Sequence, residues 1–521
     1  MPVNPTYPGI YIEELPSSTH TITAAPTSIA VFIGYTHPYK TLVFGEAVRI
    51  FSFTDYERNF GGLYSSGRLD NNVAYAVQQF FLNGGSDAYV IGLAPTLTPP
   101  VQGGYPKPGV DLGTIQFTGT EPIDGSYGMT VSITNVRSNN DVADITVTYG
   151  SRAETFRGVS LTEKLNGKPN PDYIETRVGT NAQIGPSSLV TVTHSQSSTV
   201  YSFPTGTDPT SLPLQEAPPP DAAAKVGAWS DFTDLFQVDS TLDKIDIFNL
   251  MVLPGIVQTN VVSQALAFCE RKRAFLVMDP PPNDGADSST GLTPIEDDAP
   301  TLPKSTNGAL YFPYLTSIDS LTGDVVYLPP SGYVAGIYAR TDNKRGIWKA
   351  PAGLETTITN ATGVVPLGRL SDSRAGVLNQ LGVNCLRTFP GTGTVVFGAR
   401  TAIPGGGSFD QWRYVPVRRT ALFLEQTLVR NLGWVVFEPN DEPLWIAIRT
   451  SIEAFMLSLF HQGAFQGQTP SAAFQVKCDS STTTQTDIDN GIVNILVAFR
   501  PLKPAEFVVI KIAQLAGQAQ S

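Results

Sequence analysis

The sequence predicts a mixed α/β (α+β) protein with a split α/β core, an inserted all-β outer domain, a C-terminal α+β region and an extended arm at each end. Three observations predict this class. Apolar strand patterns alternate with helical patterns on both sides of a long interruption, period-two segments fill that interruption, and prolines separate the ends from the rest. A length of 521 residues is enough for roughly two to four domains.

The split core is predicted from two β-α-β patterns. Continuous apolar runs are typical of parallel strands that are covered on both faces, and each predicted helix lies between two such runs. In chain order the predicted elements are a strand at residues 28–35, a helix at 70–82, a strand at 87–93, a strand at 245–253, a helix at 260–273 and a strand at 274–278. Because both halves share one pattern, we expect them to form one core.

Between the two halves the pattern changes to alternating apolar and polar residues. Segments 130–134, 145–149 and 189–193 alternate in this way, as half-buried strands do. Prolines lie at both edges of the interruption, around residue 95 and at 218–220, where linkers are expected. This stretch therefore predicts an inserted all-β domain.

The C-terminal third predicts two helices and a detached strand. Residues 418–432 and 444–460 carry apolar residues at helical spacing, and Asn440 and Asp441 stand where an N-cap is expected for the second helix. Gly391 and Gly393, which flank Thr392, predict a hairpin turn. In order, the predicted regions are an N-terminal arm 1–22, the first part of the core 23–94, the inserted domain 95–220, the second part of the core 221–350, a C-terminal domain 351–500 and a C-terminal arm 501–521.

Both arms contain a strand-forming segment that lacks a partner in its own region. The C-terminal segment is apolar on both faces and would be poorly hidden at the edge of its own domain, so we expect it to join another sheet. The predicted arm strands are Ile10, Tyr11, Ile12 and Glu13 at one end and Phe507, Val508, Val509, Ile510, Lys511 and Ile512 at the other.

The sequence offers no constellation that predicts catalysis, and we expect no cofactor and no metal. The net charge of −12 argues against nucleic-acid binding, the three cysteines are far apart, and the four histidines are scattered. Neither a phosphate-binding loop nor a nucleophile elbow occurs. Each acid pair has a structural explanation in an arm, a loop, a helix start or a turn: Glu13-Glu14, Asp297-Asp298, Asp441-Glu442, and Asp487 with Asp489.

Targeting signals are also missing from the pattern. The first residues lack a basic segment followed by an apolar run, so we expect no secretory signal peptide. The most apolar helical stretch, 444–460, is interrupted by Arg449 and Glu453, so we expect no direct membrane insertion.

One helical face carries an unusual set of polar residues. On the predicted helix 418–432, Arg419, Gln426 and Arg430 fall in one narrow sector opposite much of the apolar face. Two interpretations stay open: a solvated face, or a docking stripe for an acidic protein surface.

Several motifs occur in the order that is typical of one family. They are residues 7–14 (YPGIYIEE), 346–353 (GIWKAPAG), 434–440 (WVVFEPN), 463–467 (GAFQG) and 504–507 (PAEF). In these motifs the chain resembles the contractile tail sheath proteins of myophages, R-type bacteriocins and related contractile injection systems. The resemblance covers the arms, the split core and the C-terminal third, and matches 95–220 only as a variable outer insertion.

The resemblance implies a structural role. Subunits would polymerise as helically stacked six-membered rings around an inner tube and contract from a metastable extended state, with the arms adding strands to sheets of neighbouring subunits. It implies the inner tube protein and the baseplate and terminal cap proteins as partners. It also implies a helix that faces the tube. The first candidate is the helix 418–432, with Arg419, Gln426 and Arg430, and the alternative is the helix 444–460. Assembly would occur in the bacterial cytoplasm as part of a phage tail or tail-like particle, with extracellular release left open.

Two alternative hypotheses about the function come from other classes of protein. One is a carbohydrate-active enzyme with a β-rich module that would use one of the acid pairs. The other is a capsid or adhesin component, which would form a shell or bind a cell surface instead of a hollow tube.

Overall fold

The computed structural model describes most of the chain in two compact units. The described residues are 20–66, 69–94, 97–98, 107–123, 128–137, 140–179, 187–195, 202–204, 210–215, 225–226, 232–281, 295–364, 370–403 and 410–510. We call residues 28–341 and 351–413 the α/β unit, and residues 1–27, 342–350 and 414–521 the C-terminal unit. Each unit is described by itself.

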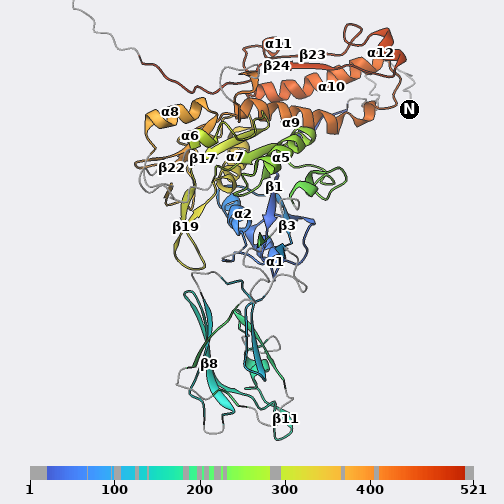
Figure 1. Cartoon of the computed structure of the whole chain (residues 1–521). Coiled ribbons are helices and arrows are strands. Elements are labelled where there is room, and N and C mark those ends of the chain that lie inside the picture. The colour runs from blue at the N-terminus through green and yellow to red at the C-terminus, as the bar shows by residue number, and fades with distance from the viewer. Residues whose placement is uncertain are drawn as a thin grey trace, which may run out of the picture. The chain divides into compact units, whose positions relative to one another are not determined.

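The α/β unit is built on a sheet of eight strands (Figure 1). Six neighbouring strands are parallel, and the two edge strands, β2 and β22, run antiparallel to their neighbours. In sheet order the strands are β2 (Ala47–Ile50), β3 (Ala88–Leu93), β1 (Ala30–Tyr35), β15 (Leu250–Val252), β16 (Phe275–Met278), β17 (Gly308–Phe312), β21 (Val383–Phe389) and β22 (Gly393–Val396). Every residue of β1, β15, β16 and β17 is buried, as expected of parallel strands covered on both faces.

The β-α-β predictions are confirmed, and both halves of the split core join this one sheet. Strand β1 pairs with β3 from the first half and with β15 from the second half, with Ala30 opposite Leu250. The predicted strand at 245–253 is shortened to β15, and the predicted turn at 391–393 connects β21 with β22. The helices of the unit are α1 (Phe53–Phe60), α2 (Asn72–Leu82), α3 (Ile174–Arg177), α5 (Thr259–Lys272), α6 (Ile295–Asp298), α7 (Ser331–Arg345, whose last turn belongs to the C-terminal unit) and α8 (Asp372–Gln380).

Two glycines allow α7 to approach α2 closely. A Cβ atom on Gly332 would lie 2.6 Å from the backbone of Ala76, and one on Gly336 would lie 2.6 Å from the carbonyl oxygen of Phe80. These distances are shorter than any carbon contact tolerates. The two glycines, one turn apart on α7, are therefore required for the close packing of α7 against α2.

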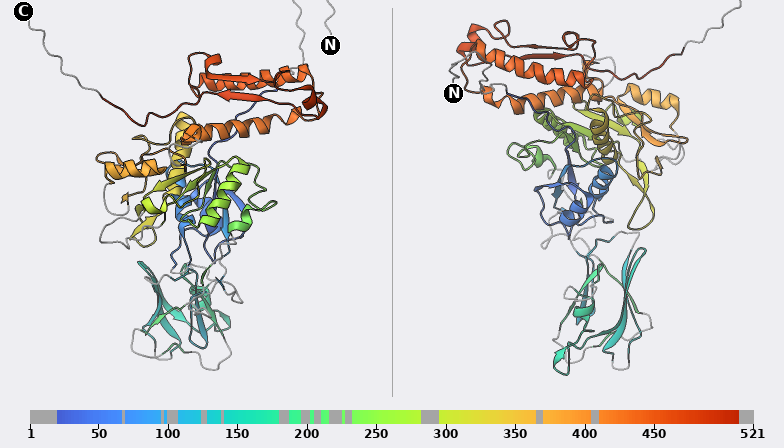
Figure 2. Two further views of the ribbon diagram at one scale, coloured as in Figure 1. Left: turned by 45° about the horizontal axis from the view of Figure 1, so that its top comes forward. Right: turned by 180° about the vertical axis from the view of Figure 1, so that it is seen from behind.

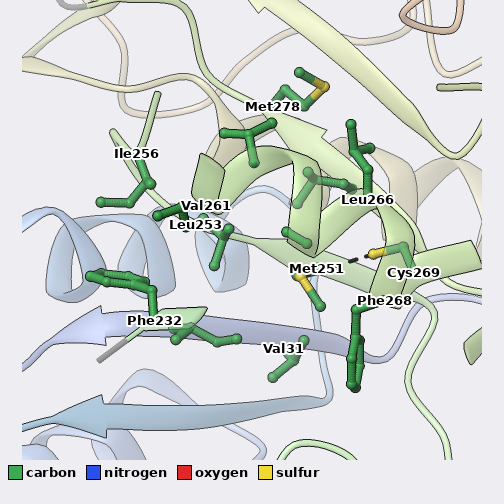
Figure 3. Packing of buried hydrophobic residues seen from close by; sticks show 14 of the residues in the cluster. Val31, Phe232, Met251, Leu253, Ile256, Val261, Leu266, Phe268, Cys269 and Met278 are labelled. Atoms are coloured by element: carbon green, nitrogen blue, oxygen red, sulfur yellow. Dashed lines mark hydrogen bonds between the residues drawn. The ribbon is translucent and has the colours of Figure 1, made fainter. Parts of the chain in front are cut away.

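One apolar core of the α/β unit lies between the sheet and α5 (Figure 3). Val31 from β1, Met251 from β15 and Cys269 from α5 belong to this core, and the sulfur of Cys269 lies 3.9 Å from the sulfur of Met251. Burial raises the pKa of the Cys269 thiol far above its ordinary value, so this cysteine behaves as a small apolar residue.

Seven strands from the described parts of the chain between residues 109 and 213 form two sheets with a core of their own. The alternating burial of β7 and β8 confirms the strands predicted at 130–134 and 145–149, and β12 confirms the one at 189–193. Phe117, Val131 and Ile145 lie in the shared core. The sheets are β12 (Val190–His194), β6 (Ile115–Gly119) and β5 (Gly109–Asp111), and β13 (Thr210–Pro213), β7 (Met129–Thr134), β8 (Val142–Tyr149) and β9 (Arg152–Ser160).

Smaller strands complete the α/β unit. The hairpin of β18 (Leu315–Ile318) and β19 (Val325–Leu328) is extended by β20 (Gly363–Val364). The remaining strands pair as β4 (Leu97–Thr98) with β14 (Lys225–Val226) and β10 (Lys164–Leu165) with β11 (Lys168–Pro169).

The C-terminal unit is built on two long helices and a two-stranded sheet (Figure 2). Both predicted helices are confirmed, and the Asp441 side chain caps the second by accepting from the amide of Leu444. The elements are α9 (Val415–Asn431), α10 (Glu442–His461), α11 (Pro470–Ala473), β23 (Phe474–Lys477), α12 (Gln485–Asp489) and β24 (Leu496–Phe499).

The boundary predicted at residue 351 differs from the observed division of the chain. Residues 351–413 belong to the α/β unit, and the C-terminal unit resumes at residue 414. The reason is that β21 pairs in parallel with β17 and so extends the large sheet. Pairing between strands some 70 residues apart leaves no signal in the local sequence pattern.

Candidate assembly surfaces

The last described residues form an exposed apolar segment. Phe507, Val508, Val509 and Ile510 are 73%, 82%, 79% and 79% exposed. Figure 2 shows this part of the chain as an extended coil, and no strand is assigned to residues 502–510. Just before it, the Tyr414 hydroxyl donates to a carboxylate oxygen of Glu506 at 3.1 Å. Four consecutive large apolar side chains in water are typical of a segment that binds a partner. The predicted Lys511 and Ile512 lie outside the described residues.

The sheet of β23 and β24 offers a place for such a partner. The two strands pair antiparallel, with Phe474 opposite Phe499. Within the described part of the chain neither has a further strand beside it. A two-stranded sheet with unpaired outer backbone groups is a template for added strands. Leu496 on β24 is 51% exposed, so apolar surface is available at this sheet.

The predicted N-terminal arm strand, Ile10 to Glu13, lies outside the described residues. The described chain starts at His20, whose ring stacks on that of Trp434 with centroids 3.9 Å apart. From there, residues 20–27 follow α9, and Ile22 is buried in the same apolar cluster as Phe423.

The prediction of an exposed stripe on α9 is wrong for two of its three residues. Arg419 is 3% exposed and Gln426 is 7% exposed, whereas Arg430 in the last turn is exposed. Both terminal nitrogens of Arg419 bond the carboxylate of Asp342, at 3.0 and 2.7 Å. One of them also donates to the carbonyl oxygen of Thr27 at 3.0 Å.

The physical reason for this error is a second covering segment. Helical spacing identifies the apolar face, but the opposite face of α9 is covered by residues 20–27 and by the end of α7, both of which are remote in sequence. Asp342 lies 77 residues from Arg419, so the sequence carries no local signal for this ion pair.

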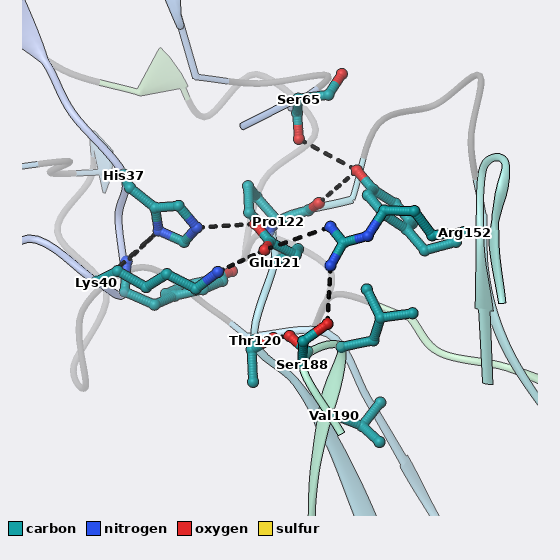
Figure 4. A network of polar contacts seen from close by, with 12 residues as sticks. His37, Lys40, Ser65, Thr120, Glu121, Pro122, Arg152, Ser188 and Val190 are labelled. Carbon is teal, nitrogen blue, oxygen red and sulfur yellow. Dashed lines mark hydrogen bonds and ion pairs between the residues drawn. The ribbon is translucent and has the colours of Figure 1, made fainter. Parts of the chain in front are cut away.

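A buried polar junction connects the inserted sheets with the core of the α/β unit (Figure 4). One oxygen of Glu121, which is 6% exposed, lies 2.9 Å from Nε2 of His37, and the other lies 2.5 Å from Nζ of Lys40 and 3.8 Å from Arg152. The amides of Tyr39 and Lys40 donate to Nδ1 of His37, so the proton of the neutral ring is on Nε2 and points to Glu121.

The charges of this junction are unevenly distributed. Burial lowers the pKa of His37 and keeps its ring neutral, although the contact with Glu121 opposes this shift. Although burial opposes ionisation of Glu121, its hydrogen bond from His37 and the charge of Lys40 lower its pKa. A single carboxylate therefore pairs with two cations at this junction. Scattered histidines gave no sign of this arrangement in the sequence.

The acid pairs have structural roles wherever their side chains are described. Asp441 caps α10, Asp487 completes a capping box with Thr484, and Asp489 accepts from Gln485 at 2.9 Å. Across the described residues there is no cluster of three His, Cys, Asp or Glu side chains that could hold a metal. Glu13 and Glu14 lie outside the described residues.

Helix α10 has the length and composition of a membrane span. One face of it, however, is part of the apolar core of the C-terminal unit, where Ile448, Ile452 and Met456 are fully buried. Core helices of soluble proteins show the same composition, so this helix is weak evidence for a membrane contact.

Together, an exposed apolar end, an open two-stranded sheet and the structural roles of the described acids are features of a protein that binds other protein chains, with no catalytic cluster among the described residues. Comparison with known proteins identifies the family. Residues 237–402 match the phage tail sheath protein central domain, and residues 408–514 match the phage tail sheath C-terminal domain. The chain belongs to the phage tail sheath protein family, a structural family and not one of enzymes.

Individual relatives are distant. A prophage major tail sheath protein of Pseudomonas aeruginosa (strain UCBPP-PA14) is 26% identical over 56% of this chain and 72% of its own length. The tail sheath protein of Vibrio phage KVP40 is 24% identical over 37% of this chain, and the match spans only 27% of that protein. The PVC sheath complex of an extracellular contractile injection system, solved in its contracted state, has the same fold, with a TM-score of 0.58, 21% identity and 98% coverage of both chains.

Proposed function

We propose that the chain polymerises as helically stacked hexameric rings around an inner tube, and that contraction of this sheath drives the tube through a target envelope. The observation that carries the proposal is the exposed apolar segment from Phe507 to Ile510. A segment of this kind needs a partner in every subunit, and a homopolymer supplies one partner for each.

Strand addition between subunits is the proposed linkage. The C-terminal arm of one subunit and the N-terminal arm of another would extend the β23–β24 sheet of a neighbour. Main-chain hydrogen bonds would give affinity, and alternate side chains would fix the register. At about 1 kcal/mol net for each hydrogen bond, four or five bonds would stabilise a link by several kcal/mol before apolar burial is added.

Such links would persist while the subunits rearrange, because an extended arm can change direction without breaking its pairing. Contraction would then be a passage from a metastable packing to one that buries more surface. Its free energy would be stored during assembly, which is consistent with a sequence that contains no phosphate-binding loop.

The tube contact is proposed at the C-terminal end of α9. Arg430 is exposed there, whereas Arg419 and Gln426 are buried. Arg430→Glu should therefore weaken co-assembly with the tube at low salt. Arg430→Lys is the matched control, because it keeps the charge. Equal co-assembly of both variants with the tube would remove Arg430 from the contact.

The wider context is part of the same proposal. Residues 95–220 would form a variable outer domain, and residues 1–22 and 501–521 would be the two arms. We propose baseplate and terminal cap proteins as further partners, assembly in the bacterial cytoplasm, and a phage tail or phage tail-like particle as the final location.

Electron microscopy of the purified protein, alone and with its tube partner, tests the proposed function. Hollow ridged cylinders of uniform width are expected. Monomers or closed shells under all conditions would contradict it, and shells would favour the capsid alternative.

A further inference from the structure

The described start of the chain is held on α9 through its backbone. The amide of Thr23 donates to Oδ1 of Asn431 at 2.9 Å, and Nδ2 of Asn431 donates to the carbonyl oxygen of Thr23 at 2.9 Å. Two residues further on, the amide of Ala25 donates to the hydroxyl of Thr427 at 3.1 Å. Two residues beyond that, the carbonyl oxygen of Thr27 accepts from Arg419.

The helix residues involved lie on one stripe. Arg419, Phe423, Thr427 and Asn431 are spaced four apart, and residues at this spacing are neighbours on a helix surface. Their partners at 23, 25 and 27 are alternate residues of an extended segment, and such residues present equivalent backbone groups to one side. Asn431 and Thr427, one turn apart, match the step from Thr23 to Ala25. Arg419 lies two turns further along the stripe, and its long side chain reaches back to Thr27, so the stripe is a complementary surface for this segment.

Arg419 connects the three chain segments that form the C-terminal unit. The C-terminal unit is formed from three segments, 1–27, 342–350 and 414–521. Arg419 bonds Thr27 at the end of the first segment and Asp342 at the start of the second, and it lies itself near the start of the third. The Arg419 and Asp342 side chains are only 3% and 2% exposed, so this ion pair is shielded from water.

We propose that Arg419, Thr427 and Asn431 form an anchor that fixes the root of the N-terminal arm on α9. Arg419 is then a positioning residue for assembly and makes no contact with the tube. The inference rests on the proposed function, in which residues 1–19 join a neighbouring copy of the chain. Any pull on that arm would pass through Thr23 into α9, because the first backbone bonds of the described chain are made there with Asn431.

Hydrogen exchange of the full-length subunit tests the anchor directly. The double variant Thr427→Val and Asn431→Ala removes the acceptors of two amides while it keeps the volume of the buried Thr427 side chain. Exchange at Thr23 and Ala25 should rise roughly five-fold or more, since one hydrogen bond contributes about 1 kcal/mol. Amides of α10 should exchange as in the unmodified protein. Val429→Ala, at an exposed apolar position of the same helix, is the control.

The role of Arg419 is tested by a graded pair of variants. Arg419→Met should raise exchange over residues 20–27, and Arg419→Lys should restore part of the protection, because it keeps the charge opposite Asp342 without the two-pronged geometry. If the Arg419→Met variant does not fold, the double variant Thr427→Val and Asn431→Ala still tests the anchor. Unchanged exchange at Thr23 and Ala25 in the double variant would overturn it.

The effect on assembly separates the anchor from the proposed function. With the tube partner, the double variant should form clearly shorter sheaths than the Val429→Ala control. Sheaths of full length, despite faster exchange at the arm root, would overturn the anchor as an assembly element. If the unmodified protein forms no sheath at all, the proposed function fails, whereas the exchange data still show whether α9 holds the segment.

Discussion

Replacing Phe507 and Val509 by threonine should break the link between subunits without unfolding them. In an extended chain these two residues share one face, and Val508 and Ile510 share the other. Phe507 and Val509 are 73% and 79% exposed, so the subunit gains almost nothing from them while it is alone. Threonine keeps the strand-forming tendency but removes most of the apolar surface.

The size of the effect follows from the burial that a partner sheet would provide. Full burial of one large apolar side chain stabilises by about 1.5–3 kcal/mol, so losing two of them should weaken each link by at least about 2 kcal/mol. This corresponds to roughly 30-fold or more in the association constant.

Analytical ultracentrifugation and electron microscopy measure this prediction. The variant should have the melting temperature of the unmodified subunit but should sediment as small species where the unmodified protein forms sheaths. Val508→Thr with Ile510→Thr tests the other face, and Lys503→Thr, at an exposed position outside the apolar segment, is the control. Sheath assembly at unchanged protein concentration by both double variants would refute strand addition by this arm.

Three further predictions concern the junction and the other arm. Glu121→Gln should destabilise the contact between the inserted sheets and the core by about 1–3 kcal/mol, because the carboxylate that pairs with Lys40 and Arg152 is lost. Glu163→Gln, at an exposed position between β9 and β10, is the control, and equal melting temperatures of the two variants would contradict the prediction. Acidification should loosen the same junction in two steps. The pKa of His37 is lowered in the folded protein, so the stability of the junction falls as the pH drops below the ordinary histidine value of 6.5. The pKa of Glu121 is also lowered, so the stability that this carboxylate provides is lost as the pH drops below its ordinary value of 4.5. Exchange at residues 37–41 measured from pH 7 to pH 4 checks this, and a constant rate after correction for intrinsic exchange would count against it. Deleting residues 1–14 should leave a folded subunit that forms no long sheaths, and sheaths of normal length from this variant would rule out the N-terminal link.

The structure also explains why some elements were predictable and others were not. Strands β1, β3 and β16 and helices α2 and α5 follow from apolar periodicity, because burial on both faces or on one stripe leaves its pattern in consecutive residues. The start of α10 was predictable for a related reason, since an N-cap is a local contact between Asp441 and the amide three residues later.

Arg419 shows where such reasoning fails. Periodicity shows which face of α9 is apolar, but it cannot show that a segment some 400 residues away covers the opposite face. The same limit applies to Glu121, whose contacts with His37 and Lys40 span more than 80 residues. In both cases the fold turns a charged residue that looks exposed into a buried one.

By itself, the sequence determined the class of elements, their order and the apolar arm that calls for a partner, because each of these depends on neighbouring residues. The three-dimensional structure was needed to show which segments pair in the large sheet, where the two units divide, and which arginine of α9 stays accessible. These features depend on contacts between segments far apart in the chain, and their free energy exists only once the segments have come together.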